Sequence, residues 1–184
     1  MTGPDAEDAA GILKRLVVDV PDYPSPGVLF KDITPVLADP VAFGRIVEAL
    51  ADAGRGTEGR PGVDHVVGME ARGFILAAPV ALALGAGFVP VRKAGKLPRA
   101  TFSQSYALEY GEATLEVHRD AFAPGDRVLL VDDVLATGGT VAATRRLVEE
   151  CGAVPVGVAV LMDLSFLPGR AAIGNLPLTS LLTV

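Results

Sequence analysis

Cysteine, histidine and aromatic residues are scarce in this sequence: its 184 residues include one cysteine, two histidines and no tryptophan. A single cysteine, Cys151, excludes an internal disulfide framework, and no cysteine–histidine spacing is typical of a zinc site. We expect Cys151 to be a small packed residue late on an apolar helix face. His65 and His118 are expected to have core or surface roles.

Positive charge is also in short supply, with 16 Lys and Arg residues against 22 Asp and Glu, a formal net charge of −6. Because an acidic surface attracts polyanions poorly, we expect no nucleic-acid partner. One basic pocket for a small phosphorylated ligand is compatible with this balance. The chain starts Met1-Thr2-Gly3-Pro4, without the basic and then apolar order of a signal peptide, so we expect a cytoplasmic protein.

The longest apolar run does not have the pattern of a membrane span. Residues 74–91 are eighteen residues with no charged or polar side chain, which reaches the spanning threshold. Two prolines and two glycines interrupt the run. It therefore predicts a buried helix over about residues 71–84, stopped at Gly85, and a buried strand over 88–91. We expect no membrane association.

Strands and helices alternate along most of the chain, which favours an α/β fold. Asp39 and Pro40 are typical of a helix start, and the proline-rich residues 23–35 predict an ordered loop. Further expected elements are strands over 63–68, 127–131 and, as the last strand, 154–162, a helix over about 140–151, and a hairpin over 101–117. Apolar strands of this kind form a mostly parallel central sheet flanked by helices. We expect residues 1–184 to form a single domain.

The strongest chemical signal is the segment from Val128 to Thr140, VLLVDDVLATGGT. A buried strand delivers two adjacent carboxylates, Asp132 and Asp133, to the carboxyl edge of the sheet, where open α/β sheets bind ligands. The following loop has small residues, two glycines and two threonine hydroxyls, and it leads into a helix, which is typical of a phosphate site. The carboxylates repel phosphate but suit sugar hydroxyls or a magnesium shell. The segment therefore predicts a ribose phosphate site.

Two other glycine motifs lack the context of a nucleotide site. Residues 54–59, GRGTEG, match G-x-G-x-x-G, but they follow a helix and lead into Arg60-Pro61-Gly62, where a helix cannot begin comfortably. Gly95-Lys96 lacks the Walker A spacing. We expect neither motif to bind a nucleotide.

Four further blocks narrow the interpretation. Residues 131–140 are similar to the phosphoribosyl-diphosphate motif of type I phosphoribosyltransferases. Four segments resemble blocks of the adenine phosphoribosyltransferase family, in the same order: 21–34 (PDYPSPGVLFKDIT), 70–74 (EARGF), 91–98 (VRKAGKLP) and 106–111 (YALEYG). The resemblance covers the chain from about Ile12 to its end. It implies the type I fold, with an N-terminal hood segment and an inserted flexible hairpin.

The resemblance also implies a reaction, the transfer of ribose 5-phosphate from phosphoribosyl diphosphate to N9 of adenine. The products are AMP and pyrophosphate, the cofactor is Mg²⁺, and family members are typically homodimers. The metal is held through substrate and water, without direct protein ligands, near the two carboxylates that bind the ribose hydroxyls, Asp132 and Asp133. The 5-phosphate is placed on Ala136, Thr137, Gly138, Gly139 and Thr140.

The pyrophosphate is assigned to the loop at Glu70 and Ala71, which carries a cis peptide in the family, and to four cationic side chains. Positive charge and backbone donors are what a leaving pyrophosphate needs. These cations are Arg72, Arg92, Lys93 and Lys96. A solvated helix start is the alternative for Arg72, and a plain surface loop is the alternative for the two lysines.

For adenine, the resemblance implies stacking between Phe30 and Leu164, with the exocyclic amine read by backbone near Leu29. Val28 and Lys31 flank that position, and Lys31 stands where many relatives carry Arg, which keeps the charge without a bidentate contact. A backbone carbonyl accepts from a 6-amino group but offers nothing to a 6-oxo group.

Glu109 and Tyr110 occupy the position of the family's mobile catalytic loop. A carboxylate there would accept the N9 proton, and the loop would exclude water from a positively charged sugar. The alternative is a solvated Glu and a packed Tyr.

Two other functions stay open on sequence alone. One is a same-fold enzyme for a 6-oxopurine, against which residues 28–34 argue. The other is a non-catalytic phosphoribosyl-binding regulator, which would need a nucleic-acid-binding element; no helix-turn-helix or basic stripe is evident.

Overall fold

The computed structural model describes residues 7–57, 62–107 and 111–184. Its main sheet has seven strands in the order β5-β6-β4-β3-β7-β8-β9. They are β3 (His65–Met69), β4 (Gly87–Lys93), β5 (Thr101–Ala107), β6 (Glu112–His118), β7 (Arg127–Leu135), β8 (Val154–Asp163) and β9 (Leu178–Thr183). β4, β3, β7, β8 and β9 pair in parallel, and β5 and β6 form an antiparallel hairpin attached to β4. The expected α/β class with a mostly parallel sheet is confirmed.

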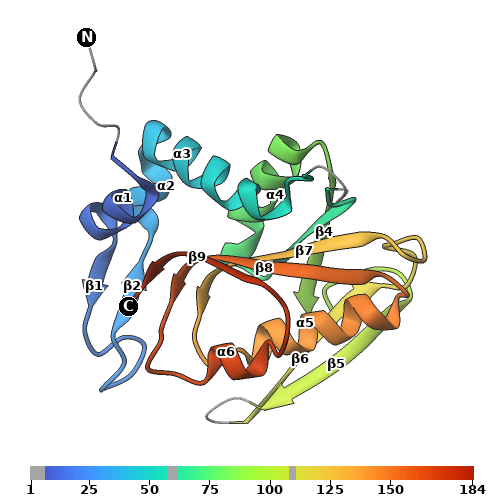
Figure 1. The fold of residues 1–184 in the computed structure, drawn as a ribbon. Helices are drawn as coiled ribbons and strands as arrows, with labels where there is room; N and C mark the ends of the chain where they lie inside the picture. The colour runs from blue at the N-terminus through green and yellow to red at the C-terminus, as the bar shows by residue number, and fades with distance from the viewer. Residues whose placement is uncertain (1–6, 58–61, 108–110) are drawn as a thin grey trace.

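Helices cover both faces of this sheet (Figure 1). One face is covered by α1 (Ala9–Leu16), α2 (Thr34–Ala38), α3 (Pro40–Ala51) with the short 3₁₀ helix η1 (Asp52–Gly54), and α4 (Arg72–Leu84). The other face is covered by α5 (Gly139–Glu150) and α6 (Gly169–Ala172). The sheet is thus the middle of three layers.

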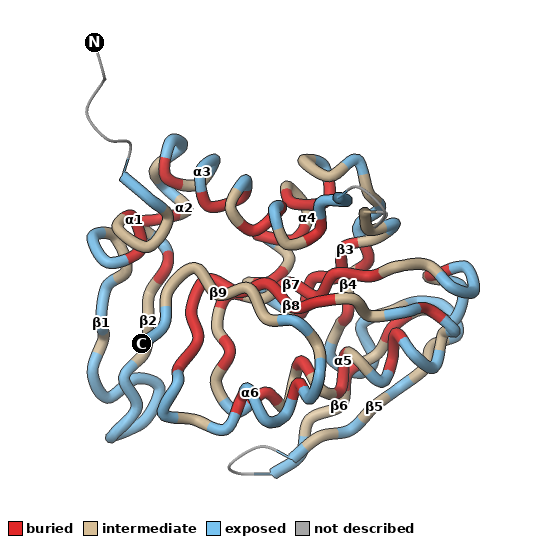
Figure 2. The backbone as a smooth tube through the Cα atoms, viewed as in Figure 1, coloured by how far each residue is buried: buried red, intermediate tan, exposed pale blue. Residues whose placement is uncertain are grey.

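Alternation along the strands explains why their sequences are continuously apolar. In β7, Leu129 and Val131 belong to the core on the side of α1–α4, whereas Val128 and Leu130 belong to the core with α5. Successive side chains of a strand point to opposite faces, so a strand covered on both faces buries every residue. Figure 2 shows the result, with the buried residues concentrated in the central strands and the inner sides of the helices.

A small hood precedes the main sheet. β1 (Val18–Val20) and β2 (Phe30–Asp32) form an antiparallel pair, which lies beside the β9 end of the molecule in Figure 1. Residues 23–35, expected to be a loop, therefore contain a strand and the start of α2. The physical reason is pairing: β2 forms its ladder with β1, a partner that the proline-rich composition does not reveal.

Two of the local signals were read correctly. Asp39 caps α3, accepting hydrogen bonds from the backbone N–H groups of Val41 (2.9 Å) and Ala42 (3.0 Å), with Pro40 in the first turn. Gly85 ends α4 in the left-handed conformation, with φ 65°.

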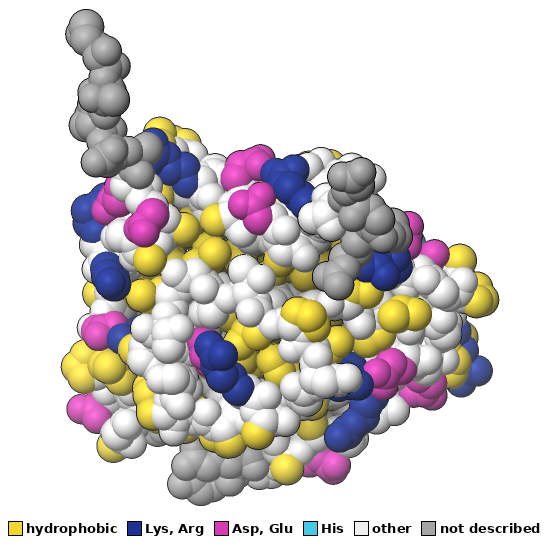
Figure 3. All heavy atoms as spheres, in the orientation of Figure 1, with side chains coloured by type: hydrophobic (Ala, Val, Ile, Leu, Met, Phe, Trp, Pro, Cys, Tyr) yellow, Lys and Arg dark blue, Asp and Glu magenta, His cyan; other side chains and the backbone are white. Residues whose placement is uncertain are grey.

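The surface of the molecule mixes charge and apolar side chains. On the face drawn in Figure 3, Lys and Arg side chains lie among Asp and Glu and among apolar patches.

The apolar run of residues 74–91 is divided between α4 and β4, as expected. None of the helices in the described part of the chain is long and apolar enough to cross a membrane.

Two predictions about the strands were wrong: the residue at which β7 ends, and the strand that comes last. The strand expected to end at residue 131 continues through both carboxylates to Leu135, because Asp132, Val134 and Leu135 pair with β8. The strand expected to be the last is followed by β9, which pairs in parallel with β8. β9 is a short edge strand whose residues are mostly half-buried, so its sequence, LTSLLT, carries neither a continuous apolar run nor a clear alternation.

Candidate active site

Two adjacent carboxylates lie near the carboxyl end of β7. The backbone N–H of Asp133 donates to Asp132 Oδ1 over 3.0 Å. Asp133 is only 5% exposed, and its Oδ2 lies 2.9 Å from Arg72 Nη2. That contact is outside hydrogen-bond geometry, and among the described residues Oδ2 has no hydrogen-bond partner. A buried carboxylate oxygen without a hydrogen-bond donor is costly, so Oδ2 depends on its ion pair with Arg72 until a ligand supplies a donor.

The surroundings of Asp132 disfavour its ionised form. Burial, followed by the charge of Asp133, raises the pKa of Asp132 well above its ordinary range, and the Arg72 guanidinium only partly opposes this. Additional positive charge or hydrogen-bond donors close to Asp132 would favour its ionised form. The pair is therefore suited to sugar hydroxyls, to a positively charged sugar or to a cation.

The loop after β7 forms a small pocket at the start of α5. Gly138 has φ 79° and precedes the helix, which has no side-chain cap, so its first N–H groups are not taken up by a capping side chain. The pocket has a volume of about 70 Å³ and is lined by Asp132, Val134, Leu135, Ala136, Thr137, Gly138, Thr140 and Val141. Free N–H groups at a helix N-terminus attract anions. This pocket fits one phosphate group.

A larger cleft of about 440 Å³ adjoins the small pocket, sharing Asp132, Val134, Ala136 and Thr140 with it. Its walls come from the hood, the start of α4, the end of β7 with its loop, and the end of β8. The lining residues are Val28, Leu29, Phe30, Lys31, Glu70, Ala71, Arg72, Asp132, Asp133, Val134, Ala136, Thr140 and Leu164. All five residues expected at adenine and both ribose carboxylates thus surround one cavity.

The turn between β3 and α4 gathers cations around a buried carboxylate. The peptide bond between Glu70 and Ala71 is cis. Glu70, whose side chain is 9% exposed, forms ion pairs with Lys96 and with Arg92 Nε (3.4 Å), and it accepts a hydrogen bond from the Lys93 N–H (3.0 Å). Burial works against ionisation, but these partners outweigh it, so the pKa of Glu70 is lowered.

These contacts divide the residues expected at pyrophosphate into two groups. Glu70, Ala71 and Arg72 line the cleft, whereas Arg92, Lys93 and Lys96 do not line it and are held near it through Glu70. Because a carboxylate repels pyrophosphate, the Glu70 side chain acts here as the counter-ion of these cations, and the assignment of the Glu70–Ala71 loop to pyrophosphate stays a prediction.

The hood supplies the apolar wall of the cleft. The guanidinium of Arg72 lies over the Phe30 ring, 4.8 Å from its centroid, and Tyr23 meets the same ring edge-on at 5.2 Å. Lys31 forms an ion pair with Asp19 of the neighbouring strand at 2.7 Å. Lys31 is thereby tied within the hood, and Val28, Leu29, Phe30 and Leu164 are the apolar residues on this side of the cleft.

The hairpin of β5 and β6 reaches the phosphate loop through Tyr106. The Thr140 hydroxyl donates to the Tyr106 hydroxyl over 3.2 Å, and a Cβ at Gly139 would lie 2.8 Å from the Tyr106 ring. No role was predicted for Tyr106, although its position four residues after Phe102 puts both side chains on one face of β5. Both pack against the core that includes α5. Glu109 and Tyr110, which lie between β5 and β6 in the sequence, are outside the described residues.

Residues that were not expected to take part lie elsewhere. His65 stacks edge-on against Phe122 at 5.4 Å, with its Nδ1 3.3 Å from Asp126, and neither histidine lines the cleft. Cys151 is half-buried at the end of α5; burial and the charge of Glu150 raise its pKa to about 11. A protonated thiol agrees with the packed role expected for it.

Comparisons with known proteins agree with this geometry. Residues 37–165 match the phosphoribosyl transferase domain family. The chain is 67% identical to an adenine phosphoribosyltransferase from Nocardioides sp., over all of this chain and 99% of that protein. Among solved structures, an adenine phosphoribosyltransferase from Saccharomyces cerevisiae complexed with adenine is 40% identical, with a TM-score of 0.87 and coverage of 95% of this chain and 98% of that one.

A third relative extends the likeness to a complex that holds product groups. The Trypanosoma brucei enzyme in complex with AMP, pyrophosphate and ribose-5-phosphate is 28% identical, with a TM-score of 0.86, and the match covers 99% of this chain and 82% of that one. Sequence identity over the full length and the shared fold lead to the same assignment. The chain belongs to the adenine phosphoribosyltransferase family.

Proposed function

We propose that the cleft transfers the 5-phosphoribosyl group of phosphoribosyl diphosphate to N9 of adenine, a purine salvage reaction that gives AMP and pyrophosphate. The observation that carries the proposal is Asp133, whose buried Oδ2 has an ion pair with Arg72 but no hydrogen-bond donor, in a cleft that joins a phosphate-sized pocket to an apolar wall. A ribose hydroxyl supplies the missing donor there, with its 5-phosphate in the small pocket and its anomeric carbon towards the base.

Asp132 and Asp133 bind the ribose hydroxyls and stabilise the positive charge that develops on the sugar as the pyrophosphate leaves. A carboxylate held close to developing positive charge, in a site with little water, lowers the barrier more than it would in bulk solvent. The loop of residues 136–140 holds the 5-phosphate through its N–H groups and threonine hydroxyls.

The pyrophosphate leaves on the side of the turn at Glu70. Arg72 exchanges Asp133 for the pyrophosphate, and Lys96 and Arg92 exchange Glu70 for it, so each cation has a carboxylate partner while the subsite is empty. Charge-assisted hydrogen bonds from guanidinium groups suit phosphate oxygens. Glu70 thus keeps the cations in place between turnovers.

Adenine lies between Phe30 and Leu164, with its 6-amino group towards the backbone near Leu29. Glu109 accepts the proton from N9 and Tyr110 helps to exclude water, so that the sugar reacts with adenine rather than with water. A 6-oxopurine is rejected because a carbonyl oxygen facing a backbone carbonyl has no donor between them.

Mg²⁺ fits this site as a partner of the substrate. The raised pKa of Asp132 and the unpartnered oxygen of Asp133 both favour positive charge close to the two carboxylates. Oxygen ligands from phosphate groups, hydroxyls and water are those that Mg²⁺ prefers. When bound, the metal neutralises charge on the diphosphate; Asp132 and Asp133 would hold it through the substrate and water.

The reaction is tested by incubating the protein with phosphoribosyl diphosphate, Mg²⁺ and each of adenine, hypoxanthine and guanine, and measuring pyrophosphate and nucleotide. AMP from adenine alone is the expected result, and omission of Mg²⁺ should abolish it. Activity with a 6-oxopurine would contradict the recognition argument. Tight AMP binding without turnover would identify a regulator instead.

The chain acts as a homodimer in the cytoplasm, and one surface supports the dimer. After Arg72, α4 has no polar side chain, yet Ile75 and Leu82 are 45% and 83% exposed. They are seven residues apart, so they lie on one stripe of the helix. Exposed apolar stripes of this kind mark protein contacts. The proposed cytoplasmic location of the protein is tested by cell fractionation.

A further inference from the structure

One segment contributes to both subsites, because it carries Leu164 on the base side of the cleft and packs against the loop of residues 136–140. Residues 164–172 follow β8 and include α6. At one end, Leu164 lines the cleft and is 9% exposed. Near the other end, Gly169 packs directly against the Ala136 carbonyl, and a Cβ on Gly138 would lie 2.8 Å from the Gly169 carbonyl oxygen. The segment therefore contains a candidate base partner, Leu164, and contacts two members of the phosphate loop, Ala136 and Gly138.

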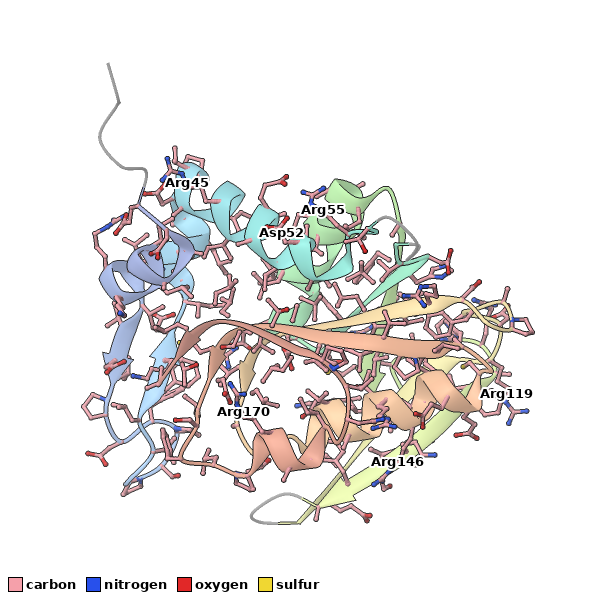
Figure 4. The ribbon with its side chains drawn as sticks, in the orientation of Figure 1. Arg45, Asp52, Arg55, Arg119, Arg146 and Arg170 are labelled. Carbon is pink, nitrogen blue, oxygen red and sulfur yellow. The ribbon has the colours of Figure 1, made fainter. Side chains whose placement is uncertain are left out.

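An ion pair closes this segment at its base. Asp163, the last residue of β8, is 1% exposed, and its Oδ2 accepts a hydrogen bond from Arg170 Nε at 2.6 Å. Arg170 belongs to α6 and is itself 60% exposed; Figure 4 shows its side chain reaching from α6 toward the strands. Asp163 is paired with Leu135 across the sheet, so the ion pair lies where the phosphate loop leaves β7.

The burial of Asp163 gives the ion pair its strength. A buried carboxylate requires a charged or hydrogen-bonding partner, whereas an exposed guanidinium does not. The pair therefore holds Arg170, and with it α6, against the end of the sheet. The backbone of Leu164 is anchored at the same place, because its N–H donates to the Leu135 carbonyl over 3.0 Å.

We propose that Asp163 and Arg170 are positioning residues for the nucleotide: their ion pair fixes Leu164 at the base and α6 against the phosphate loop at the same time. AMP spans both contacts, so its affinity depends on the pair. Pyrophosphate binds near Glu70, with which the pair shares no contact. This inference rests on the proposed function, because it assigns the base to the Leu164 wall and the phosphate to the loop at 136–140.

The test compares Arg170→Gln, Asp163→Asn and the double variant with the unaltered enzyme. A matched control is Arg55→Gln, since Arg55 forms ion pairs with Asp52 (2.9 Å) and Glu48, none of which lines the cleft. Figure 4 shows Arg55 and Asp52 on the side of the sheet opposite Arg170. The measurements are the Kd of AMP and of pyrophosphate by calorimetry, the KM for adenine against kcat, and the melting temperature.

We expect Arg170→Gln to raise both the Kd of AMP and the KM for adenine by about tenfold, because displacements near 1 Å are costly in such sites. The Kd of pyrophosphate and kcat should change by less than about threefold, within the scatter expected of sites that share no partner. Two residues that act as one unit are not additive, so the double variant should be no worse than the more damaged single one. Arg55→Gln should leave all ligand affinities unchanged.

Two results would overturn the inference. If Arg170→Gln lowers the melting temperature but leaves the AMP affinity unchanged, the Asp163–Arg170 ion pair stabilises the fold and does not position the nucleotide. An equal loss of AMP and pyrophosphate affinity would show a general disturbance of the site. If the unaltered enzyme itself forms no AMP from adenine, the proposed function fails, and that result is obtained before any variant is compared.

Discussion

Asp132 and Asp133 are neighbours in β7, but their surroundings differ. Asp133 is nearly fully buried and has an oxygen without a donor, whereas Asp132 accepts a backbone hydrogen bond and has a raised pKa. Removing the charge of either one should therefore change activity and stability in different proportions. That difference separates a binding role from a structural one.

Asp133→Asn should lower kcat/KM for phosphoribosyl diphosphate by about 100-fold, close to the loss seen when one electrostatic contact to a transition state is removed. The amide places a donor or a weaker acceptor where the ribose hydroxyl requires a carboxylate. Steady-state kinetics at saturating adenine measure the effect, with circular dichroism to confirm folding. Asp120→Asn is the control, since Asp120 also pairs with an arginine, Arg99, but on the exposed surface. Normal turnover in Asp133→Asn would contradict the site assignment.

Asp132→Asn should make the unliganded protein more stable at pH 7 while lowering its activity. The folded-state pKa of Asp132 is raised, so its ionisation costs folding free energy as the pH rises from the ordinary carboxyl range through that value. Asn carries no such cost. A gain of about 1 kcal/mol corresponds to about 2–4 °C in Tm for a chain of this size. Thermal melts at pH 5 and pH 8 check this: the advantage of the variant should grow with pH, and an advantage that shrinks would contradict the sign.

Some site residues could be identified from the sequence because they are contiguous. Asp132 to Thr140 occur as one run, so strand, carboxylates and phosphate loop are read together. Ion pairs such as Glu70 with Lys96 and Arg72 with Asp133 join residues 26 and 61 positions apart. No local pattern encodes such contacts, and the counter-ion role of Glu70 became clear only from the folded chain.

The junction of β7, its loop and α5 is the element on which the phosphate subsite depends. Its packing against α6 is close enough that Gly138 has no room for a side chain on that side. The boundaries of the elements here were the least accurately predicted. β7 extends past its apolar residues because β8 continues to pair with it, and β9 forms because the edge of β8 is available. Both are tertiary effects, and propensity does not contain them.

Gly138→Ala should destabilise the protein and lower its affinity for ribose 5-phosphate. A left-handed φ of 79° costs an alanine about 1–2 kcal/mol, and the new methyl group would also press against α6, 2.6 Å from Ala172 Cβ. Gly125→Ala is the control, because Gly125 has φ 87° but nothing within 4 Å of the added carbon. It should show the conformational cost alone, with normal phosphate affinity. Calorimetric titration and chemical denaturation measure both; equal affinity in the two variants would contradict the packing argument.

The outer stripe of α4, where Ile75 and Leu82 are exposed, is the surface proposed for the contact between the two copies of a homodimer. Leu82→Lys should convert a homodimer into a monomer, because a charge buried in an apolar interface has no partner. Sedimentation equilibrium measures the change. Val154→Lys, at an exposed apolar position of β8, is the control and should remain dimeric. A Leu82→Lys protein with the unaltered molecular mass would place the contact elsewhere or exclude it.

Two of the stretches that line the cleft are far apart in the chain. Residues 28–31 of the hood line the side proposed for the base, and the end of β7 with its loop lines the side proposed for the ribose phosphate. Each stretch is held by its own backbone pairing, β1 with β2 in one case and the central sheet in the other. Residues 28–31 can therefore be varied while the backbone pairing of β7 in the central sheet is kept. Libraries varied only in residues 28–31 would sample unnatural purine bases while the sugar-activating half is kept, which makes this scaffold a starting point for enzymatic synthesis of nucleotide analogues.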